Sequence, residues 1–157
     1  MTPVITYKIA ISTDDFAQGT ELFREYASFL PVDLSFQNFD RELNNIAVIY
    51  AKPQGALLLA VSGEQAIGCL GIRQLEPGIC ELKRMYVKKE SRGLDIGQEL
   101  LQRSLVIAKQ LGYESIRLDS FEDMRSALAL YRAFGFYTIG PYRYNPFNGA
   151  IFMEKKL

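Results

Sequence analysis

Apolar and polar residues follow two different spacings near the start of the chain. They alternate through Val4–Ser12, which predicts a strand. In Phe16–Leu30 the apolar residues recur on one face of a helix, with Thr13 or Asp14 as the candidate N-cap and Pro31 as the stop. The chain is therefore expected to open with a strand followed by an amphipathic helix.

The next part of the chain has first a sparse and then a dense apolar pattern. Val32–Asn45 carries few apolar residues among acids and amides, which predicts one short helix between loops. Three dense β-type runs follow, separated by turns at 62–65 and 76–78. They predict an antiparallel meander of three strands, at Ala56–Val61, Ala66–Leu75 and Ile79–Val87.

Two further helices are predicted in the second half of the chain. Helical spacing of apolar residues begins after Asp95 and stops at Gly112, which predicts a long helix. A second helical segment follows at Met124–Phe134 and is closed by Gly135. Short β-type runs flank this segment, at Ser115–Leu118, Phe136–Ile139 and Ala150–Glu154.

The order of these elements defines the expected fold class. Helices that connect strands make part of a sheet parallel, whereas the meander is antiparallel. We therefore expect an α+β, mixed α/β fold: a central mixed, mainly antiparallel sheet of about seven strands flanked by four helices. At 157 residues, without repeat or linker, the chain is expected to form a single domain over residues 1–157.

Composition narrows the classes of function. Eighteen Lys and Arg balance eighteen Asp and Glu, so no net field favours nucleic acid or an anionic membrane. His is absent, which removes imidazole from every catalytic or metal role. Cys69 and Cys80 lack zinc-site spacing, so two buried thiols and no metal are expected. Without a membrane-length apolar run or a signal-peptide pattern, a cytoplasmic protein is expected.

The segment Arg92–Gly97 leads from the meander into the long helix. A helix N-terminus exposes unpaired N–H groups and a partial positive charge, so a glycine-containing turn there can hold a pyrophosphate. Gly93 and Gly97 let the backbone approach a ligand closely. A plain junction of loop and helix can have the same residues. Basic side chains also concentrate around this segment, which would suit an anionic ligand, and the alternative is a solvated loop. These basic side chains are Lys83, Arg84, Lys88, Lys89 and Arg92.

Two motifs give the chain a resemblance to the GNAT superfamily of N-acetyltransferases. In that family a strand leads through [RQ]-x-x-G-x-[GA] into a helix, and Arg92, Ile96 and Gly97 match this pattern. Leu130–Phe136 resembles the family's later LYxxxGF element and lies at the expected separation. The resemblance covers nearly the whole chain, and it implies the GNAT fold with acetyl-CoA as the acyl donor.

Two positions depart from the family pattern. Asp95 stands where the family usually has the first glycine of its motif, and a carboxylate aimed at a pyrophosphate would repel it. We therefore expect Asp95 to point away and cap the helix. Met124 lies near the place where many members have Asn, so a polar contact to the cofactor arm is expected to be missing.

The resemblance also implies the residues that carry the reaction. An ammonium group must lose a proton before it attacks a thioester, and Glu81 is the candidate general base. The alternative is that Glu81 pairs with an arginine of a neighbouring strand. The N–H of Met85 is expected to hold the thioester carbonyl, and Tyr131 either protonates the leaving thiolate or is a core tyrosine. The expected cofactor contacts are Met85, Tyr86, Val87, Arg92, Gly93, Leu94, Asp95, Ile96, Gly97 and Gln98.

The acceptor site is expected between the first two helices and the C-terminal strands. These segments carry Phe36, Phe39, Tyr142, Arg143 and Tyr144. Arg143 is suited to a substrate carboxylate, and the two tyrosines to an aliphatic or cationic amine. The alternative is an aromatic-rich loop that only closes the core.

The sequence thus predicts an acetyl-CoA-dependent N-acetyltransferase that modifies a primary amine, of a small molecule, by direct attack on the thioester. The alternative is a GNAT-like domain that binds acyl-CoA, is catalytically weak or inactive, and has a regulatory role. Asp95 and Met124 favour this alternative, whereas Glu81 and Tyr131 favour the enzyme. No nucleic-acid or membrane partner is expected, and a homodimer is an open alternative to a monomer because dimers are frequent among similar proteins.

Overall fold

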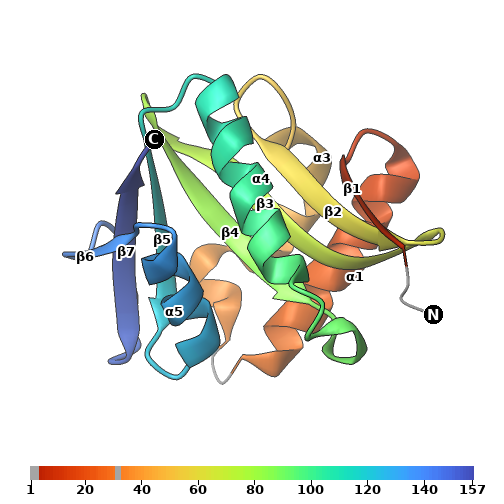
Figure 1. Ribbon diagram of the computed structural model, residues 1–157. Coiled ribbons are helices and arrows are strands. Elements are labelled where there is room, and N and C mark those ends of the chain that lie inside the picture. The colour runs from red at the N-terminus through yellow and green to blue at the C-terminus, as the bar shows by residue number, and fades with distance from the viewer. Residues whose placement is uncertain (1–3, 31–32) are drawn as a thin grey trace.

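A seven-stranded sheet forms the centre of the computed structural model, which describes residues 4–30 and 33–157 (Figure 1). The strands lie in the order β1-β2-β3-β4-β5-β7-β6. Their bounds are β1 Ile5–Ile9, β2 Ala56–Ser62, β3 Gln65–Glu76, β4 Ile79–Val87, β5 Ser115–Phe121, β6 Tyr137–Ile139 and β7 Ala150–Lys156. The helices are α1 Thr13–Phe29, α2 Phe39–Asn44, α3 Ile46–Ile49, α4 Ile96–Gln110 and α5 Arg125–Ala133, with 3₁₀ turns η1 Leu34–Gln37 and η2 Lys89–Ser91.

The sheet is antiparallel everywhere except at its centre, where β4 and β5 run parallel. This parallel pairing covers only Ile79–Glu81 against Ser115–Arg117. Beyond those residues the two strands separate, and Figure 1 shows them diverging. The predicted mixed, mainly antiparallel sheet is confirmed, and the opening between β4 and β5 is its main irregularity.

Both faces of the sheet are covered, so the central strands are apolar on both sides. Along β2, Leu57 and Leu59 pack in the core formed with α1, α2 and α3. Their neighbours Ala56, Leu58 and Ala60 pack in the core formed with α4 and α5. Figure 1 shows α4 and α5 on one face and α1 on the other. This burial on both faces explains why the meander reads as dense apolar runs instead of an alternating pattern.

The N-terminal region differs from the prediction in its helix boundaries. Ser12 is the N-cap of α1, where Thr13 or Asp14 was expected. The Ser12 hydroxyl accepts a bond from the N–H of Asp15, whose carboxylate in turn accepts from the N–H of Ser12. This reciprocal capping box fixes the start of the helix. The predicted stop, Pro31, lies outside the described residues.

The segment predicted as one short helix is broken into several turns. Asn38 has φ 57°, in the left-handed region, and it separates η1 from α2. The four-residue α3 follows directly, so the described residues contain five α-helices, one more than the predicted four. Asparagine tolerates this backbone conformation better than most residues, which explains a break that apolar spacing does not reveal.

Two further expectations concern the thiols and the membrane. Cys69 and Cys80 are buried and unpaired with each other, as expected. Burial raises the pKa of the Cys80 thiol to about 12, so it is protonated and unreactive at neutral pH. Within residues 4–30 and 33–157, no helix has the length and apolarity needed to cross a membrane.

Candidate active site

Strand β4 contains a β-bulge next to the opening in the sheet. Its pairing with β3 shifts register between Cys69 and Gly71, so that Arg84 and Met85 together stand opposite one residue of β3. Arg84 has φ 59°, a conformation that is uncommon for residues other than glycine. A bulge leaves one residue out of the hydrogen-bond ladder and bends the strand. The bulge therefore lies at Met85, the residue predicted to bind the thioester carbonyl.

The conformation of Arg84 is held by α2. Its Nη2 donates to Glu42 Oε1 at 2.7 Å and its Nε donates to Glu42 Oε2 at 3.2 Å. The hydroxyl of Tyr50 donates to the same carboxylate at 2.8 Å, and the ring of Phe39 lies 5.2 Å from the guanidinium carbon. Burial acts to raise the pKa of Glu42, but the bonds from Arg84 outweigh it and hold that pKa below its ordinary value. Glu42 is thus a buried carboxylate that stays ionised.

A cleft of about 660 Å³ lies between the end of β4, the C-terminal end of α1, the N-terminus of α4 and α5. Nine of the ten predicted cofactor contacts line it: Met85, Tyr86, Val87, Arg92, Gly93, Asp95, Ile96, Gly97 and Gln98. Leu94 is 42% exposed and is not part of the lining. The remaining walls come from α1 and α5: Tyr26, Phe29, Leu30, Ser91, Asp123, Met124, Ser126, Ala127 and Leu130.

The floor of this cleft has the features of a phosphate site. Gly93 has φ 89°, and a Cβ added there would meet no other atom within 4 Å. A Cβ on Gly97 would fill space between Leu130 and Val87, at 4.0 Å from each. The first N–H groups of α4 lack partners within the helix and point out of its N-terminus, as at every helix start. The site therefore fits the diphosphate and the extended arm of coenzyme A.

Asp95 is the N-cap residue of α4 by position, but the predicted capping bond is wrong. Its side chain makes no capping hydrogen bond with any of the described residues. Its φ is 58° and its ψ 24°, which is the left-handed region. An N-cap side chain reaches the helix N–H groups from an extended backbone, so the left-handed conformation turns the carboxylate away from them. The backbone shape, and not a capping role, explains why glycine is usual at this position of the family motif.

Tyr131 lies on α5 in the apolar core and is not among the residues that line the cleft, although its neighbour Leu130 is. It is buried, and its ring lies 5.7 Å from that of Phe136. Burial raises the pKa of its hydroxyl above the ordinary value, and the charge of Asp119 acts in the same direction. The phenol is therefore protonated at neutral pH. Met124, the N-cap residue of the same helix, lines the cleft together with the polar residues Asp123 and Ser126.

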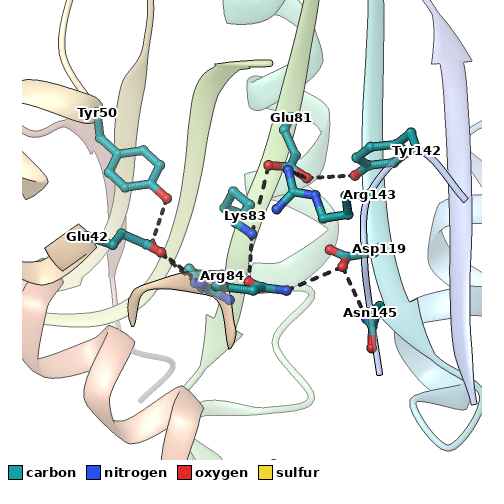
Figure 2. A network of polar contacts seen from close by, with 10 residues as sticks. Glu42, Tyr50, Glu81, Lys83, Arg84, Asp119, Tyr142, Arg143 and Asn145 are labelled. Atoms are coloured by element: carbon teal, nitrogen blue, oxygen red, sulfur yellow. Dashed lines mark hydrogen bonds and ion pairs between the residues drawn. The ribbon is translucent and has the colours of Figure 1, made fainter. Parts of the chain in front are cut away.

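A second group of polar side chains lies on the α1 side of the sheet, around Glu81 (Figure 2). Glu81 is 1% exposed. Its Oε2 accepts a bond from the hydroxyl of Tyr142 at 2.6 Å and pairs with Nη2 of Arg143 at 2.5 Å. Its Oε1 lies 3.8 Å from Lys83 Nζ. The pairing with an arginine, one of the two predicted alternatives, is thus present, although the arginine belongs to the segment between β6 and β7.

A chain of bonds joins Lys83 to the facing strand β5. Lys83 Nζ donates to Gln37 Oε1 at 2.9 Å, and Gln37 Nε2 donates to Asp119 Oδ2 at 3.4 Å. Asn145 Nδ2 lies 3.5 Å from the same carboxylate oxygen (Figure 2). These groups border a small cavity of about 20 Å³, which has room for one water molecule. We call it the inner chamber; its lining is Tyr26, Leu34, Gln37, Leu82, Lys83, Arg84, Asp119 and Phe121.

The inner chamber adjoins the cofactor cleft. Tyr26 lines both spaces, and of the two residues of the β4 bulge, Arg84 lines the chamber and Met85 the cleft. Burial lowers the pKa of Lys83 to about 8, and the charge of Arg84 acts in the same direction. Burial likewise raises the pKa of Tyr26 to about 12. At neutral pH the chamber therefore contains a protonated lysine and a neutral phenol.

The residues predicted to bind the acceptor are placed in different surroundings. The side chain of Phe36 lies outside the described part of the structure. Phe39 packs on Arg84, and Tyr142 and Arg143 bond Glu81. Arg143 keeps a buried Nε that has no partner among the described residues, but its terminal Nη2 is taken by Glu81. Tyr144 is 75% exposed and lies apart from this group.

Sequence reasoning missed the polar residues of the inner chamber, Gln37 and Asp119 above all. One signal was present for Asp119. In Ser115–Phe121 buried and half-buried residues alternate, so Asp119 shares the face of Arg117 and points away from the apolar core. The sequence alone gives no signal for Gln37, because it reaches Lys83 across 46 positions of the chain.

Comparison with known proteins places this site in a family. A model of the Acetyltransferase (GNAT) family matches residues 19–136. An uncharacterised N-acetyltransferase of Schizosaccharomyces pombe is 38% identical over 152 residues, which are 96% of this chain and 91% of the relative. These matches define an acyltransferase. The chain belongs to the GNAT family.

Solved structures share the fold over nearly the whole chain. A GNAT acetyltransferase of Staphylococcus aureus superposes with a TM-score of 0.79 at 22% identity and covers 98% of this chain and 99% of its own. PaiA N-acetyltransferase of Thermoplasma acidophilum, solved in complex with coenzyme A, superposes with a TM-score of 0.73 at 20% identity, covering 98% and 99%. The predicted GNAT fold is thereby confirmed.

Proposed function

We propose that the protein transfers the acetyl group of acetyl-CoA to a primary amine of a small molecule. The observation that carries the proposal is that two spaces meet the β4 bulge from different sides: Met85 lines the cofactor cleft, Arg84 lines the inner chamber, and Tyr26 lines both. The cofactor cleft has the helix N-terminus and the strand edge that suit coenzyme A, and the inner chamber has the charged groups that suit an amine. A thioester carbonyl at the bulge would face both.

The backbone of β4 would hold the donor in place. The N–H of Met85, at the bulge, is proposed to donate to the thioester carbonyl oxygen and to stabilise negative charge as it develops there. The amide of Val87 would bond the extended arm of the donor, as a neighbouring strand would. The N–H groups of Gly93–Gln98 would bind the diphosphate. In this arrangement the arm takes the place that β5 leaves open beside β4.

Tyr131 is proposed as the general acid. When the amine nitrogen forms its bond to the carbonyl carbon, the carbon–sulfur bond breaks and the sulfur needs a proton. The buried hydroxyl of Tyr131 is protonated at neutral pH, because burial raises its pKa. It would donate that proton to the sulfur. The proton that the general base takes from the amine would then pass through solvent and reprotonate Tyr131.

Two carboxylates compete for the role of general base. Glu81, predicted from the resemblance, is closed in by Tyr142, Arg143 and Lys83. Asp119 lines the inner chamber and has only long contacts from the two amides of Gln37 and Asn145. We propose Asp119 as the group that accepts the proton of the amine. Glu81 would then position Lys83 and the segment that carries Tyr142.

A paired measurement tests the proposal. Coenzyme A binding would be followed by calorimetry, and release of the free thiol would be followed with acetyl-CoA and a panel of primary amines. Binding together with amine-dependent thiol release is the expected result. Tight binding without turnover of any amine would instead identify a regulatory acyl-CoA-binding domain, and the absence of binding would overturn both functions.

A further inference from the structure

The charges around the inner chamber pair with each other in an uneven way. Three cationic side chains face three carboxylates there. Arg84 is bonded to Glu42 at 2.7 Å, and Arg143 is paired with Glu81 at 2.5 Å. This leaves Lys83, whose Nζ lies 3.8 Å from Glu81 Oε1, and Asp119, which forms no ion pair within 4.0 Å among the described residues.

A neutral amide bridges these two remaining charges. Gln37 turns its carbonyl oxygen toward Lys83 Nζ at 2.9 Å and its nitrogen toward Asp119 Oδ2 at 3.4 Å. The amide thus presents an acceptor to the cation and a donor to the anion. A ligand with a carboxylate and an amine would make both contacts with full charges, and hydrogen bonds between ionised groups are the stronger kind.

The spacing limits how far apart the two groups of such a ligand lie. In the amide of Gln37 a single carbon separates oxygen from nitrogen. In an α-amino acid two carbons separate the amine from a carboxylate oxygen, so the ligand is one atom longer. The contact to Asp119 is long for a hydrogen bond, and one more atom shortens it. A ligand whose amine and carboxylate stand several carbons apart does not match this span.

From this arrangement we infer that the acceptor is an α-amino acid or a closely related amine, whose carboxylate binds Lys83 and whose amine lies on Asp119 after displacing Gln37. The inference rests on the proposed function and names its substrate class. The chamber as it stands has a volume of about 20 Å³, which is room for one water molecule, so Gln37 must leave before an acceptor enters. When no substrate is bound, the side chain of Gln37 occupies this place and keeps water out of it.

The placement of the chamber agrees with the chemistry. Lys83 precedes the bulge and Met85 is part of it, so an amine on Asp119 lies on the chamber side of the position proposed for the thioester carbonyl. Lys83 is protonated at neutral pH, since its pKa is lowered only to about 8 by burial and by the charge of Arg84. It therefore has the charge that a carboxylate requires.

Matched acceptors provide the test. The twenty standard amino acids would be offered one at a time as free acids and as C-terminal amides, beside carboxylate-free alkylamines, and thiol release from acetyl-CoA would be measured. For at least one amino acid, kcat/KM of the free acid is expected to exceed that of the amide by about tenfold or more, the size of one lost charged bond. Lys83→Met is expected to abolish this ratio by raising KM for the acid.

Two further variants keep the test decisive. Gln37→Ala should lower KM for the free acid several-fold and retain the acid-to-amide ratio, because it removes the plug and keeps both charges. Lys109→Met, on the exposed end of α4, serves as the control that leaves the ratio unchanged. If Lys83→Met does not fold, the Gln37→Ala result and the acid-to-amide ratio of the wild type still decide whether the acceptor is an α-amino acid.

Three results would overturn the inference. Turnover of alkylamines or amino-acid amides at least as fast as that of free acids would refute the substrate class and leave the acetyltransferase proposal intact. A ratio that survives in Lys83→Met would remove the lysine from recognition. Failure of every acceptor would refute the proposed function itself, and this inference with it.

Discussion

Arg84 and Glu42 form a buried two-pronged ion pair that joins α2 to the bulge in β4. Both residues are largely inaccessible to solvent, and the two bonds measure 2.7 and 3.2 Å. The bulge orients the N–H that we propose to bind the thioester, and the backbone of Arg84 has an unusual positive φ there. The geometry of the reaction centre therefore depends on a helix that does not contact the cofactor cleft.

Removing one partner of this pair is expected to destabilise the protein strongly. Glu42→Gln leaves the Arg84 charge buried without compensation, which typically costs about 3–5 kcal/mol. Urea unfolding followed by circular dichroism measures the change. Glu99→Gln breaks the exposed 2.7 Å pair with Arg103 and is the matched control, with an expected loss of about 0.5 kcal/mol or less. Equal losses in the two variants would contradict the role of the buried pair.

Asp95 is expected to be replaceable by glycine without loss of affinity. Asp95→Gly should leave acetyl-CoA binding unchanged or tighten it, because it removes a negative charge from the diphosphate site and suits the left-handed backbone. Asp95→Ala removes the charge but keeps the strained φ, so it should cost about 1 kcal/mol of stability. Calorimetry and thermal unfolding separate the two effects. A large loss of affinity in Asp95→Gly would show that the carboxylate itself contacts the ligand.

Tyr131→Phe is expected to slow turnover by about 100-fold while the fold is retained, since the proposed general acid is lost and the ring remains. Tyr113→Phe is the matched control. That tyrosine is buried in the same apolar core, and its hydroxyl bonds a backbone carbonyl, that of Gln54. Steady-state thiol release measures both. Similar rates for the two variants would make Tyr131 a core residue without a catalytic part.

The two candidate bases are expected to differ in what their loss changes. Asp119→Asn should lower kcat by about 100-fold, because the accepting carboxylate is gone. Glu81→Gln should lower the free energy of unfolding, because it breaks the contacts with Tyr142 and Arg143, and should change kcat much less. Thiol release and urea unfolding measure the two effects, and a large loss of kcat in Glu81→Gln but not in Asp119→Asn would return the role of base to Glu81.

Lys83 gives the stability of the protein a specific pH dependence. Its pKa is about 8 in the folded protein, lowered by burial, against an ordinary value of 10.5. Between these two values the unfolded chain binds one more proton than the folded protein, so the contribution of Lys83 to stability rises with pH in that window. Unfolding free energies of the wild type minus Lys83→Met should therefore increase from pH 7.5 to 10. A difference that is flat or falls over this range would contradict the buried, charged lysine.

The fold could be predicted where local signals and packing agree. Ile79–Val87 was predicted with the bounds of β4, because apolar residues fill both faces of this central strand and turns with glycine end it. The long helix was predicted from the same kind of agreement, including Gly112 with its φ of 95°. The break at Asn38 was not predicted, since a single residue in the left-handed region leaves no periodic trace.

The candidate site was predictable only in its local part. The residues of the predicted phosphate-binding segment, Arg92–Gly97, are neighbours in sequence, and all of them but Leu94 line the cleft. The chamber residues come from α1, η1, β4 and β5, so their meeting depends on the sheet order and on the packing of α1 and η1 against it. Arg143 shows the limit of such reasoning. It was assigned to a substrate carboxylate, but the fold brings it to Glu81, and sequence distance gives no indication of this.

Because β4 and β5 diverge, the sheet has strand edges with unpaired backbone groups in its interior as well as at its outer strands. Unpaired backbone at the outer border of a sheet attracts strands of other proteins and promotes aggregation. Here the same groups lie in a slot walled by the ends of α1 and α5, beyond the reach of a folded neighbour. The protein can thus keep unpaired strand backbone without the risk of aggregation that an exposed outer strand carries. If the arm of coenzyme A binds there as proposed, it is recognised by main-chain groups of β4, which do not depend on the identity of the surrounding side chains.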